Sequence, residues 1–412
     1  MKNITKILSI LVIALFSISC TQAQTTIKVA QNNDWVFVSP IVPKIDITAV
    51  NNSQNAVKEL VTLQIETDKH EKLFVLSQTA DILGKDSAKI TFEFSLQAGF
   101  YRCEVFLANS SVKQFNIGVN PEEIVSKPDY QPDIKEFWDR AKAELALVKP
   151  EYKITQIKDT FNNKQRKLYL VKMKSLGGVE VGGFLSVPVK KGKFPADIHY
   201  MGYGSKPWQP GGMADRVEFV LSTRNQGLYE NTATGNQWIC WGLEDIEKYY
   251  YRGAFMDLIR AIDFVCSLPS VDTENIFAEG ASQGGAFTLA AAALDNRLKA
   301  IAPQIPFLSD YPDYFQIVDW PGNWLLDKQK ELKMSDEQFY KNLSYFDIKN
   351  IVQWITCPVI MGVGLQDDVC PPHTNFSGYN LITTKKEYRI YPNEKHSTGK
   401  GWWEAKEEFW GK

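Results

Sequence analysis

The sequence predicts a chain in two parts: a small all-β immunoglobulin-like sandwich, followed by an α/β domain with a mostly parallel sheet flanked by helices. Three observations indicate this. Residues 25–119 contain short runs of alternating apolar and polar residues without a helical pattern. From residue 133 onward, short apolar runs alternate with helical patterns, which is typical of an α/β sheet. The total of 412 residues is enough for two domains.

The composition is that of a globular protein. Lys and Arg number 46 and Asp and Glu 48, so the formal net charge is −2, and 44% of the residues are hydrophobic. This balance argues against a nucleic-acid-binding protein, which would carry a basic surface. Histidine is scarce, so any chemistry that needs it must draw on four residues: His70, His199, His373 and His396.

Residues 1–20 resemble an export signal. Two lysines precede an apolar run at 7–16, which is too short to span a membrane. Small residues then precede Cys20, as in a bacterial lipoprotein signal in which that cysteine is lipidated. The alternative is ordinary cleavage after Ala23. Either interpretation predicts an extracytoplasmic protein, periplasmic, outer-membrane-anchored or secreted, that meets the membrane only through a lipid anchor.

Three segments of the first domain show clear strand alternation, at 61–65, 90–96 and 101–107. We expect this sandwich to be a spacer that packs against the next domain, with sugar binding as the alternative. Residues 120–132 carry three prolines and read as a linker. Five cysteines follow Cys20 without any Cys-x-x-Cys, so we expect buried thiols and no disulfide framework.

The α/β domain is predicted to span 133–412. Asp133 is expected to cap a helix with an apolar face, and a second helix is expected over 257–268. The candidate strands are 168–173, 198–201, 217–221, 276–278, 359–363 and 388–391.

The strongest chemical signal is Gly280-Ala281-Ser282-Gln283-Gly284, which lies between a short strand and a helix rich in small residues. This Gly-x-Ser-x-Gly pattern is typical of the nucleophile elbow of α/β-hydrolases. Gly280 and Gly284 let the strand and helix approach closely. The backbone N–H of Gln283 would then point at the developing oxyanion.

A nucleophilic serine needs a base, and the base needs an orienting carboxylate. In α/β-hydrolases the chain order is Ser, Asp or Glu, then His. His396 follows a strand and lies in the loop where the base is expected. His373 is the weaker candidate, because it shares a loop with the carboxylates. Asp367 and Asp368 both follow the strand at 359–363, and chain order does not separate them.

Residues 366–373 also gather Asp, Cys and His side chains. Their spacing fits no standard zinc pattern, so we expect no metal and no cofactor.

Several motifs resemble the acetyl xylan esterase and cephalosporin C deacetylase family, carbohydrate esterase family 7, over about residue 130 to the C-terminus. Met201-Gly202-Tyr203-Gly204 is similar to the family's oxyanion loop His-Gly-Tyr-Gly, and Arg224-Asn225-Gln226-Gly227 to its Arg-Gly-Gln motif. The others are Tyr249-Tyr250-Tyr251-Arg252, Ser267-Leu268-Pro269-Ser270-Val271-Asp272, Gly280-Ala281-Ser282-Gln283-Gly284-Gly285, Pro306-Phe307-Leu308 and Gly364-Leu365-Gln366-Asp367-Asp368-Val369-Cys370-Pro371-Pro372.

The resemblance implies a serine esterase that deacetylates small acetylated sugars such as xylo-oligosaccharides. Ser282 would be the nucleophile, His396 the base and Asp367 the orienting acid, since Asp367 ends the family's Gly-Leu-x-Asp. The oxyanion donors would be the backbone N–H groups of Gln283 and Tyr203. Arg224 and Gln226 would form a structural motif.

Three departures from the family pattern bear on substrate preference and loop geometry: Met201 replaces a His, Asn225 replaces a Gly, and Ser397 stands where Glu is frequent. The family often forms rings of six subunits, so the resemblance allows a homo-oligomer, which the added domain or a lipid anchor would obstruct. Two rival hypotheses remain. One is another α/β-hydrolase, a broader esterase or a peptidase, and the other is a non-catalytic sugar-binding lipoprotein.

Overall fold

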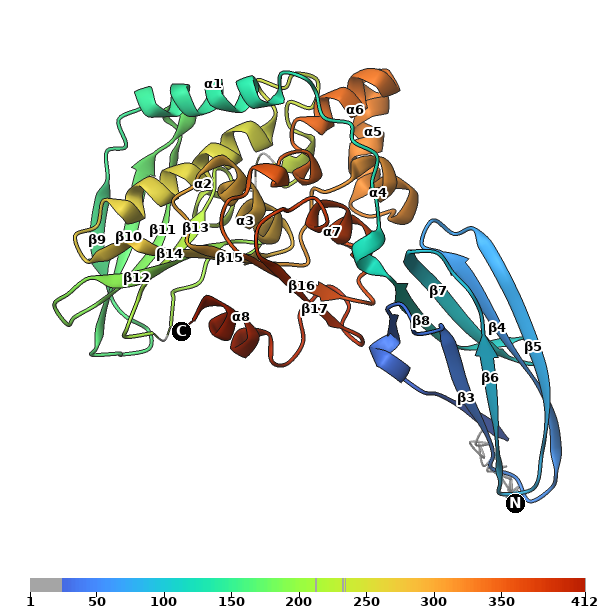
Figure 1. The fold of residues 1–412 in the computed structure, drawn as a ribbon. Coiled ribbons are helices and arrows are strands. Elements are labelled where there is room, and N and C mark those ends of the chain that lie inside the picture. Colours follow the sequence, from blue (N-terminus) through green and yellow to red (C-terminus); the bar gives the residue numbers. More distant parts are fainter. Residues whose placement is uncertain (1–23, 212, 232, 234, 412) are drawn as a thin grey trace, which may run out of the picture.

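The computed structural model describes residues 24–411 except 212, 232 and 234. The predicted signal at 1–20 and Cys20 therefore lie outside the described residues. Figure 1 shows two parts side by side, an elongated all-β lobe and a larger lobe in which helices cover a sheet. The prediction of an α/β fold preceded by an all-β domain is confirmed.

The first lobe is a sandwich of two sheets, with strand orders β1-β3-β6 and β2-β8-β7-β4-β5. Alternate residues of its strands fill the space between the sheets, as in β6, where Ile90 and Phe92 are buried. The strands are β1 Thr25–Val29, β2 Val36–Phe37, β3 Lys44–Asn51, β4 Val57–Thr67, β5 Lys72–Ile82, β6 Ser87–Glu93, β7 Gly99–Leu107 and β8 Ser110–Val119.

The second lobe is built on a nine-stranded sheet of order β17-β16-β15-β14-β12-β13-β11-β10-β9. The six strands from β13 to β17 pair in parallel, and β11, β10 and β9 extend the sheet antiparallel. The strands are β9 Lys153–Ile157, β10 Arg166–Lys174, β11 Glu180–Pro188, β12 Phe194–Tyr200, β13 Val217–Ser222, β14 Val271–Ala281, β15 Ala300–Gln304, β16 Val359–Gly364 and β17 Lys386–Tyr391.

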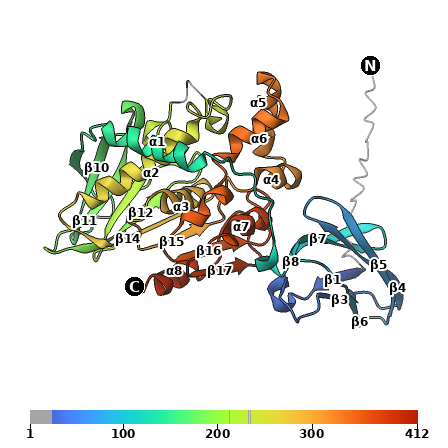
Figure 2. The same cartoon turned by 45° about the horizontal axis from the view of Figure 1, so that its top comes forward.

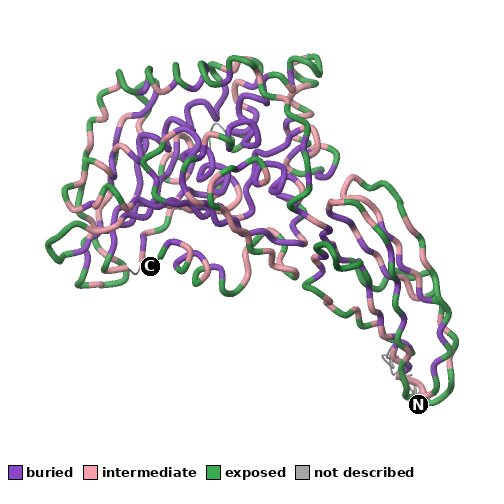
Figure 3. Tube along the Cα trace, viewed as in Figure 1, coloured by how far each residue is buried: buried purple, intermediate pink, exposed green. Residues whose placement is uncertain are grey.

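Helices cover both faces of this sheet. In Figures 1 and 2, α1, α2, α3 and α7 lie on one side of it and α8 on the other. Figure 3 shows that the sheet and the helices against it form the buried centre. The helices are α1 Ile134–Leu147, α2 Tyr250–Cys266, α3 Gln283–Leu294, α4 Tyr311–Ile317, α5 Gly322–Leu332, α6 Asp336–Ser344, α7 Pro372–Tyr379 and α8 Trp402–Trp410. None of the described helices is both long and apolar enough to cross a lipid bilayer.

One predicted helix start and one predicted cap hydrogen bond need correction. The helix expected over 257–268 begins at Tyr250, because its first two turns are buried on all sides and show no apolar stripe. Asp133 occupies the N-cap position of α1, but its side chain makes no cap hydrogen bond. The Asp133 carboxylate instead accepts a 2.6 Å hydrogen bond from the Tyr345 hydroxyl, a tertiary contact that competes with capping.

The two lobes share one apolar core. Met361, Val363 and Leu365 of the α/β lobe are buried in the same cluster as the sandwich interior. Phe100 of β7 packs on Phe376 of α7 with ring centroids 5.7 Å apart. The boundary between the lobes is therefore packed like an interior.

Candidate active site

The chain makes a sharp turn at Ser282, between the end of β14 and the start of α3. Ser282 has φ 60° and ψ −121°, a strained conformation for a residue with a side chain. Its N–H donates to the Gln304 carbonyl at 3.0 Å, and its own carbonyl accepts from the Phe307 N–H at 3.1 Å. These two bonds hold the strained residue on neighbouring segments.

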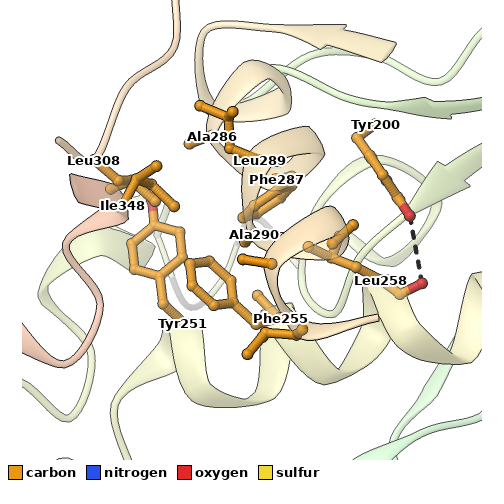
Figure 4. Packing of buried hydrophobic residues seen from close by; sticks show 14 of the residues in the cluster. Tyr200, Tyr251, Phe255, Leu258, Ala286, Phe287, Leu289, Ala290, Leu308 and Ile348 are labelled. Carbon is orange, nitrogen blue, oxygen red and sulfur yellow. Dashed lines mark hydrogen bonds between the residues drawn. The ribbon is translucent and has the colours of Figure 1, made fainter. Parts of the chain in front are cut away.

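Glycines on both sides allow this turn. A Cβ on Gly280 would collide with the carbonyl oxygens of Gly284 and Tyr200, and one on Gly284 would collide with Tyr200. The helix that follows is fixed from its other side: Figure 4 shows Phe287 and Ala290 of α3 packed against Tyr251 and Phe255 of α2. The start of α3 is thus rigidly placed, and the first N–H groups of a helix have no intrahelical partner. The N–H of Gln283 is one of these groups.

Asp367 and His396 meet at the ends of β16 and β17. His396 Nδ1 lies 2.9 Å from Asp367 Oδ2 and 3.1 Å from Oδ1. Asp367 Oδ1 also accepts the N–H groups of Val369 and Cys370 at 2.8 and 2.9 Å. The Asp367 side chain is fully buried, whereas that of Asp368 is 68% exposed and lies 3.9 Å from Lys395. The structure thus distinguishes the two neighbouring aspartates: Asp367 contacts His396, and Asp368 faces solvent.

Ser282 and His396 line the same two cavities, and Tyr203 lines both as well. No hydrogen bond joins Ser282 to His396 among the described residues, although such bonds often tighten only when substrate binds. The first cavity has a volume of about 600 Å³ and also exposes Trp208, Glu279 and other residues. The second, of about 190 Å³, is mostly apolar, and its walls include Ile239, Phe307, Trp320, Trp324 and Val369.

Gln226 supports the loop that carries Tyr203. Its Oε1 accepts the Gly204 N–H at 3.1 Å, and its Nε2 donates to the Tyr250 hydroxyl at 2.8 Å. The Gln226 amide also bonds with the Gln283 amide at 3.1 Å. One buried side chain therefore connects the loop at 202–204 to the first residue of α3.

Arg224 anchors the segment at 224–227 to helix α2. It forms a two-pronged pair with Asp257 of α2, at 2.9 Å from Nε and 2.7 Å from Nη2. Asn225 has φ 59°, the left-handed region in which glycine is favoured and asparagine is among the best tolerated alternatives. The replacement of the family's glycine by Asn225 therefore suits this backbone.

The other two departures have local contacts. Met201 is buried, and its sulfur lies 3.5 Å from the Ser222 hydroxyl. Ser397 donates a 2.6 Å hydrogen bond to Glu394 within the loop of His396.

Two of the remaining histidines lie outside both cavities. His373, the rival of His396, contacts Asp68 through Nδ1 at 2.8 Å and Asp313 through Nε2 at 2.9 Å. His70 lies in a turn of the sandwich with φ 68°.

His199 lines the larger cavity and lies 3.0 Å from Glu279, which also binds Lys406 at 2.8 Å. Burial lowers the pKa of His199, but the nearby carboxylates of Glu218 and Glu279 outweigh it and raise the pKa to about 9. A histidine held charged in this way is a poor proton acceptor at neutral pH.

Sequence reasoning missed Cys370, which it treated as one of several buried thiols. Burial and the charge of Asp367 raise the pKa of the Cys370 thiol well above its ordinary value, although contact with the Ser282 hydroxyl lowers it. Cys370 thus lies beside Asp367 and Ser282 as a protonated, neutral thiol. A cysteine nucleophile would instead need to be a thiolate. Its place in Asp-x-x-Cys-Pro-Pro was the available signal.

Asp310, Asp313 and His373 have ligand-type atoms within 4.8 Å of one another. Both carboxylates already have lysine partners, since Lys349 lies 2.7 Å from Asp310 and Lys69 lies 2.6 Å from Asp313. We interpret this cluster as a group of ion pairs.

Comparisons with known proteins agree with this site. A family model described as Acetyl xylan esterase (AXE1) matches residues 122–412. Acetyl esterase Axe7A of Xylanibacter ruminicola is 30% identical over 298 residues, which cover 68% of this chain and 67% of that protein.

Two solved structures are similar to this chain. Acetyl xylan esterase 1 from Thermoanaerobacterium sp. is 28% identical with a TM-score of 0.64, over 70% of this chain and 96% of that one. The acetyl xylan esterase from Paenibacillus sp. R4 is 29% identical with a TM-score of 0.66, over 71% of this chain and 98% of that one. With its strained serine between β14 and α3, the chain belongs to the acetyl xylan esterase family and is a carboxylic ester hydrolase of the α/β-hydrolase type.

Proposed function

We propose that this chain removes acetyl groups from acetylated xylan fragments through an acetyl-serine intermediate. Ser282 is the nucleophile, His396 the general base and Asp367 the acid that orients it. The observation that carries the proposal is the contact of His396 Nδ1 with Asp367 at 2.9 Å. It leaves Nε2 for the serine hydroxyl, as in other Ser-His-Asp enzymes.

The reaction has two steps. Ser282 Oγ attacks the acetyl carbonyl while His396 takes its proton, and the N–H groups of Gln283 and Tyr203 bind the oxyanion. The C–O bond to the sugar then breaks, and His396 protonates the leaving alcohol. Water, deprotonated by His396, attacks the acetyl-serine in the same way and releases acetate and free Ser282.

The two cavities suggest how the substrate divides. The smaller, apolar cavity suits a short acyl group, and Trp320 and Trp324 limit it. The larger cavity, whose lining includes the polar side chains of Ser205, Glu279 and Gln304 as well as the exposed Trp208, suits a sugar. A chain-length series of nitrophenyl esters tests this division: activity should fall steeply beyond short acyl groups, and Trp320→Ala should extend the range. Equal activity on long chains would favour the broader esterase.

The central test is Ser282→Ala with p-nitrophenyl acetate and with acetylated xylo-oligosaccharides. We expect a loss of activity of about 10⁴-fold or more. Ser267→Ala is the matched control, because this hydroxyl caps the end of α2 through the Phe264 carbonyl, away from both cavities. Wild-type activity in Ser282→Ala would contradict the proposal. Failure of wild-type Ser282 to react with a fluorophosphonate would favour a binding protein.

The pattern of residues 1–20 supports a further proposal, that the protein is exported and carries a lipid on Cys20. Cys20→Ala followed by cell fractionation tests it. Release of the variant from the membrane fraction is expected, and unchanged membrane association would exclude the lipid anchor.

A further inference from the structure

The side chain of Gln366 lies where three segments of the fold meet. Its Oε1 accepts the backbone N–H of Asn116, in strand β8 of the sandwich, at 2.6 Å. Its Nε2 donates to the Asn116 carbonyl at 3.2 Å and to the Pro392 carbonyl at 2.8 Å. In return, Asn116 Nδ2 donates to the Leu365 carbonyl at 3.1 Å. Gln366 immediately precedes Asp367, and Pro392 begins the loop that carries His396.

Strand β8 offers these groups because its outer edge is mostly free. The neighbouring strand β2 pairs only with Gly118 and Val119, so it ends before Asn116. Asn116 is a half-buried residue, so its backbone N–H and C=O need hydrogen-bond partners. The carboxamide of Gln366 has an acceptor and a donor with the same spacing as those of a peptide group. It therefore pairs with the edge of β8 as a residue of a neighbouring strand would.

Apolar packing fixes the same place. Leu365 is completely buried in the core that the two lobes share, directly before Gln366. The backbone N–H of Gln366 donates to the Glu394 carbonyl at 2.9 Å, so the loops of Asp367 and His396 are joined at this residue. Movement of Gln366 would therefore shift Asp367 relative to His396.

From this geometry we infer that Gln366 is a positioning residue: it uses strand β8 of the sandwich to hold Asp367 against His396. The sandwich is then part of the scaffold of the active site and does more than separate domains. The inference rests on the proposed roles of Asp367 and His396. It concerns the variable position of Gly-Leu-x-Asp, which no motif assigns.

The test is Gln366→Met in the full chain, because methionine has a similar length and makes none of the three hydrogen bonds. We expect kcat on p-nitrophenyl acetate to fall about 10- to 100-fold with KM within about twofold, since small displacements of catalytic groups cost this much. Asn380→Leu is the matched control. Asn380 also donates two amide hydrogen bonds to the segment that joins the lobes, to Pro121 and Ile124 at 3.0 and 2.9 Å, but it does not contact Asp367.

Asn116→Ala tests the same contact by a change in the sandwich. It removes only the side-chain hydrogen bond from Asn116 to the Leu365 carbonyl and keeps the backbone bonds to Gln366. It should lower kcat a few-fold and combine non-additively with Gln366→Met. If Gln366→Met does not fold, an unchanged kcat in Asn116→Ala overturns the inference. The inference is also overturned if kcat falls to the same extent in Gln366→Met and in the control Asn380→Leu.

Ser282→Ala, measured in the same assay, distinguishes failure of the positioning role from failure of the proposed function. If it is inactive while Gln366→Met keeps its kcat, only the positioning role fails. If Ser282→Ala is active, the proposed function fails, and the positioning role fails with it.

Discussion

Two histidines lie near the edge where the lobes meet, and their surroundings differ in a way that separates chemistry from architecture. His396 touches a carboxylate through one nitrogen, and its side chain is 30% exposed in the cavities of Ser282. His373 touches carboxylates through both nitrogens, Asp68 on one side and Asp313 on the other, and is 14% exposed. A base needs one free nitrogen, whereas a histidine with a carboxylate against each nitrogen acts as a link between elements.

The largest expected effect is that of His396→Ala. Without a base the serine stays protonated, so we expect kcat to fall by about 10⁴-fold or more while the thermal midpoint changes little. Steady-state hydrolysis of p-nitrophenyl acetate measures the first and calorimetry the second. Activity within tenfold of wild type would break the comparison, since it would leave His373 or His199 as the base.

Asp367→Asn should have the next largest effect. The amide keeps the shape but loses the charge that stabilises the protonated imidazole and favours the correct tautomer, so we expect kcat to fall about 10³- to 10⁴-fold. Asp368→Asn is the control, since that exposed carboxylate should be dispensable. If Asp368→Asn proved the more harmful, the assignment of the acid would be wrong.

His373→Asn should affect stability instead. It removes a partly buried link between Asp68 of the sandwich and Asp313 of α4, which we expect to cost about 1–3 kcal/mol of unfolding free energy. We expect kcat to stay within about threefold. Urea denaturation and the esterase assay together test this. A loss of activity comparable to that of His396→Ala would reverse the roles.

The smallest effect is a pH dependence of that link. Burial lowers the pKa of His373, but the hydrogen bond to Asp313 and the nearby carboxylate of Asp68 outweigh it and raise the pKa to about 9. Because the ordinary value is about 6.5, the stabilisation is complete below pH 6.5 and is lost as the pH rises through about 9. The stability difference between wild type and His373→Asn should therefore be larger at pH 6 than at pH 10. His199 is present in both proteins and cancels.

Sequence patterns predicted the strands that bury one face and the strands that are buried along their whole length. The alternation at Ile90 and Phe92 and the apolar run of β16 are such cases, because side-chain period directly reports the buried face. The first turns of α2 lack such a signal, since tyrosine, arginine and glycine are all buried there by tertiary contacts. Helices α4, α5 and α6 between β15 and β16 were not predicted.

The site divides in the same way. The Gly-x-Ser-x-Gly pattern predicted Ser282, and chain order together with the scarcity of histidine predicted His396. Chain order and side-chain periodicity do not separate Asp367 from Asp368, because the two are neighbours; only the resemblance of Gly-Leu-x-Asp favoured Asp367, and the direction in which the loop turns decides which carboxylate is buried. The roles of Gln226 and Gln366 depend on contacts with segments distant in the chain, from β8 to the loop at 202–204. No local pattern records such contacts.

The shared core has a consequence for how this chain can be divided. An α/β lobe cut free near residue 120 would expose Met361, Val363, Leu365 and Phe376, all of which are buried in the intact protein. A contiguous apolar surface of this kind favours aggregation. The sandwich is therefore not an appendage that can be trimmed or exchanged at will, and the two lobes are expected to unfold as one cooperative unit.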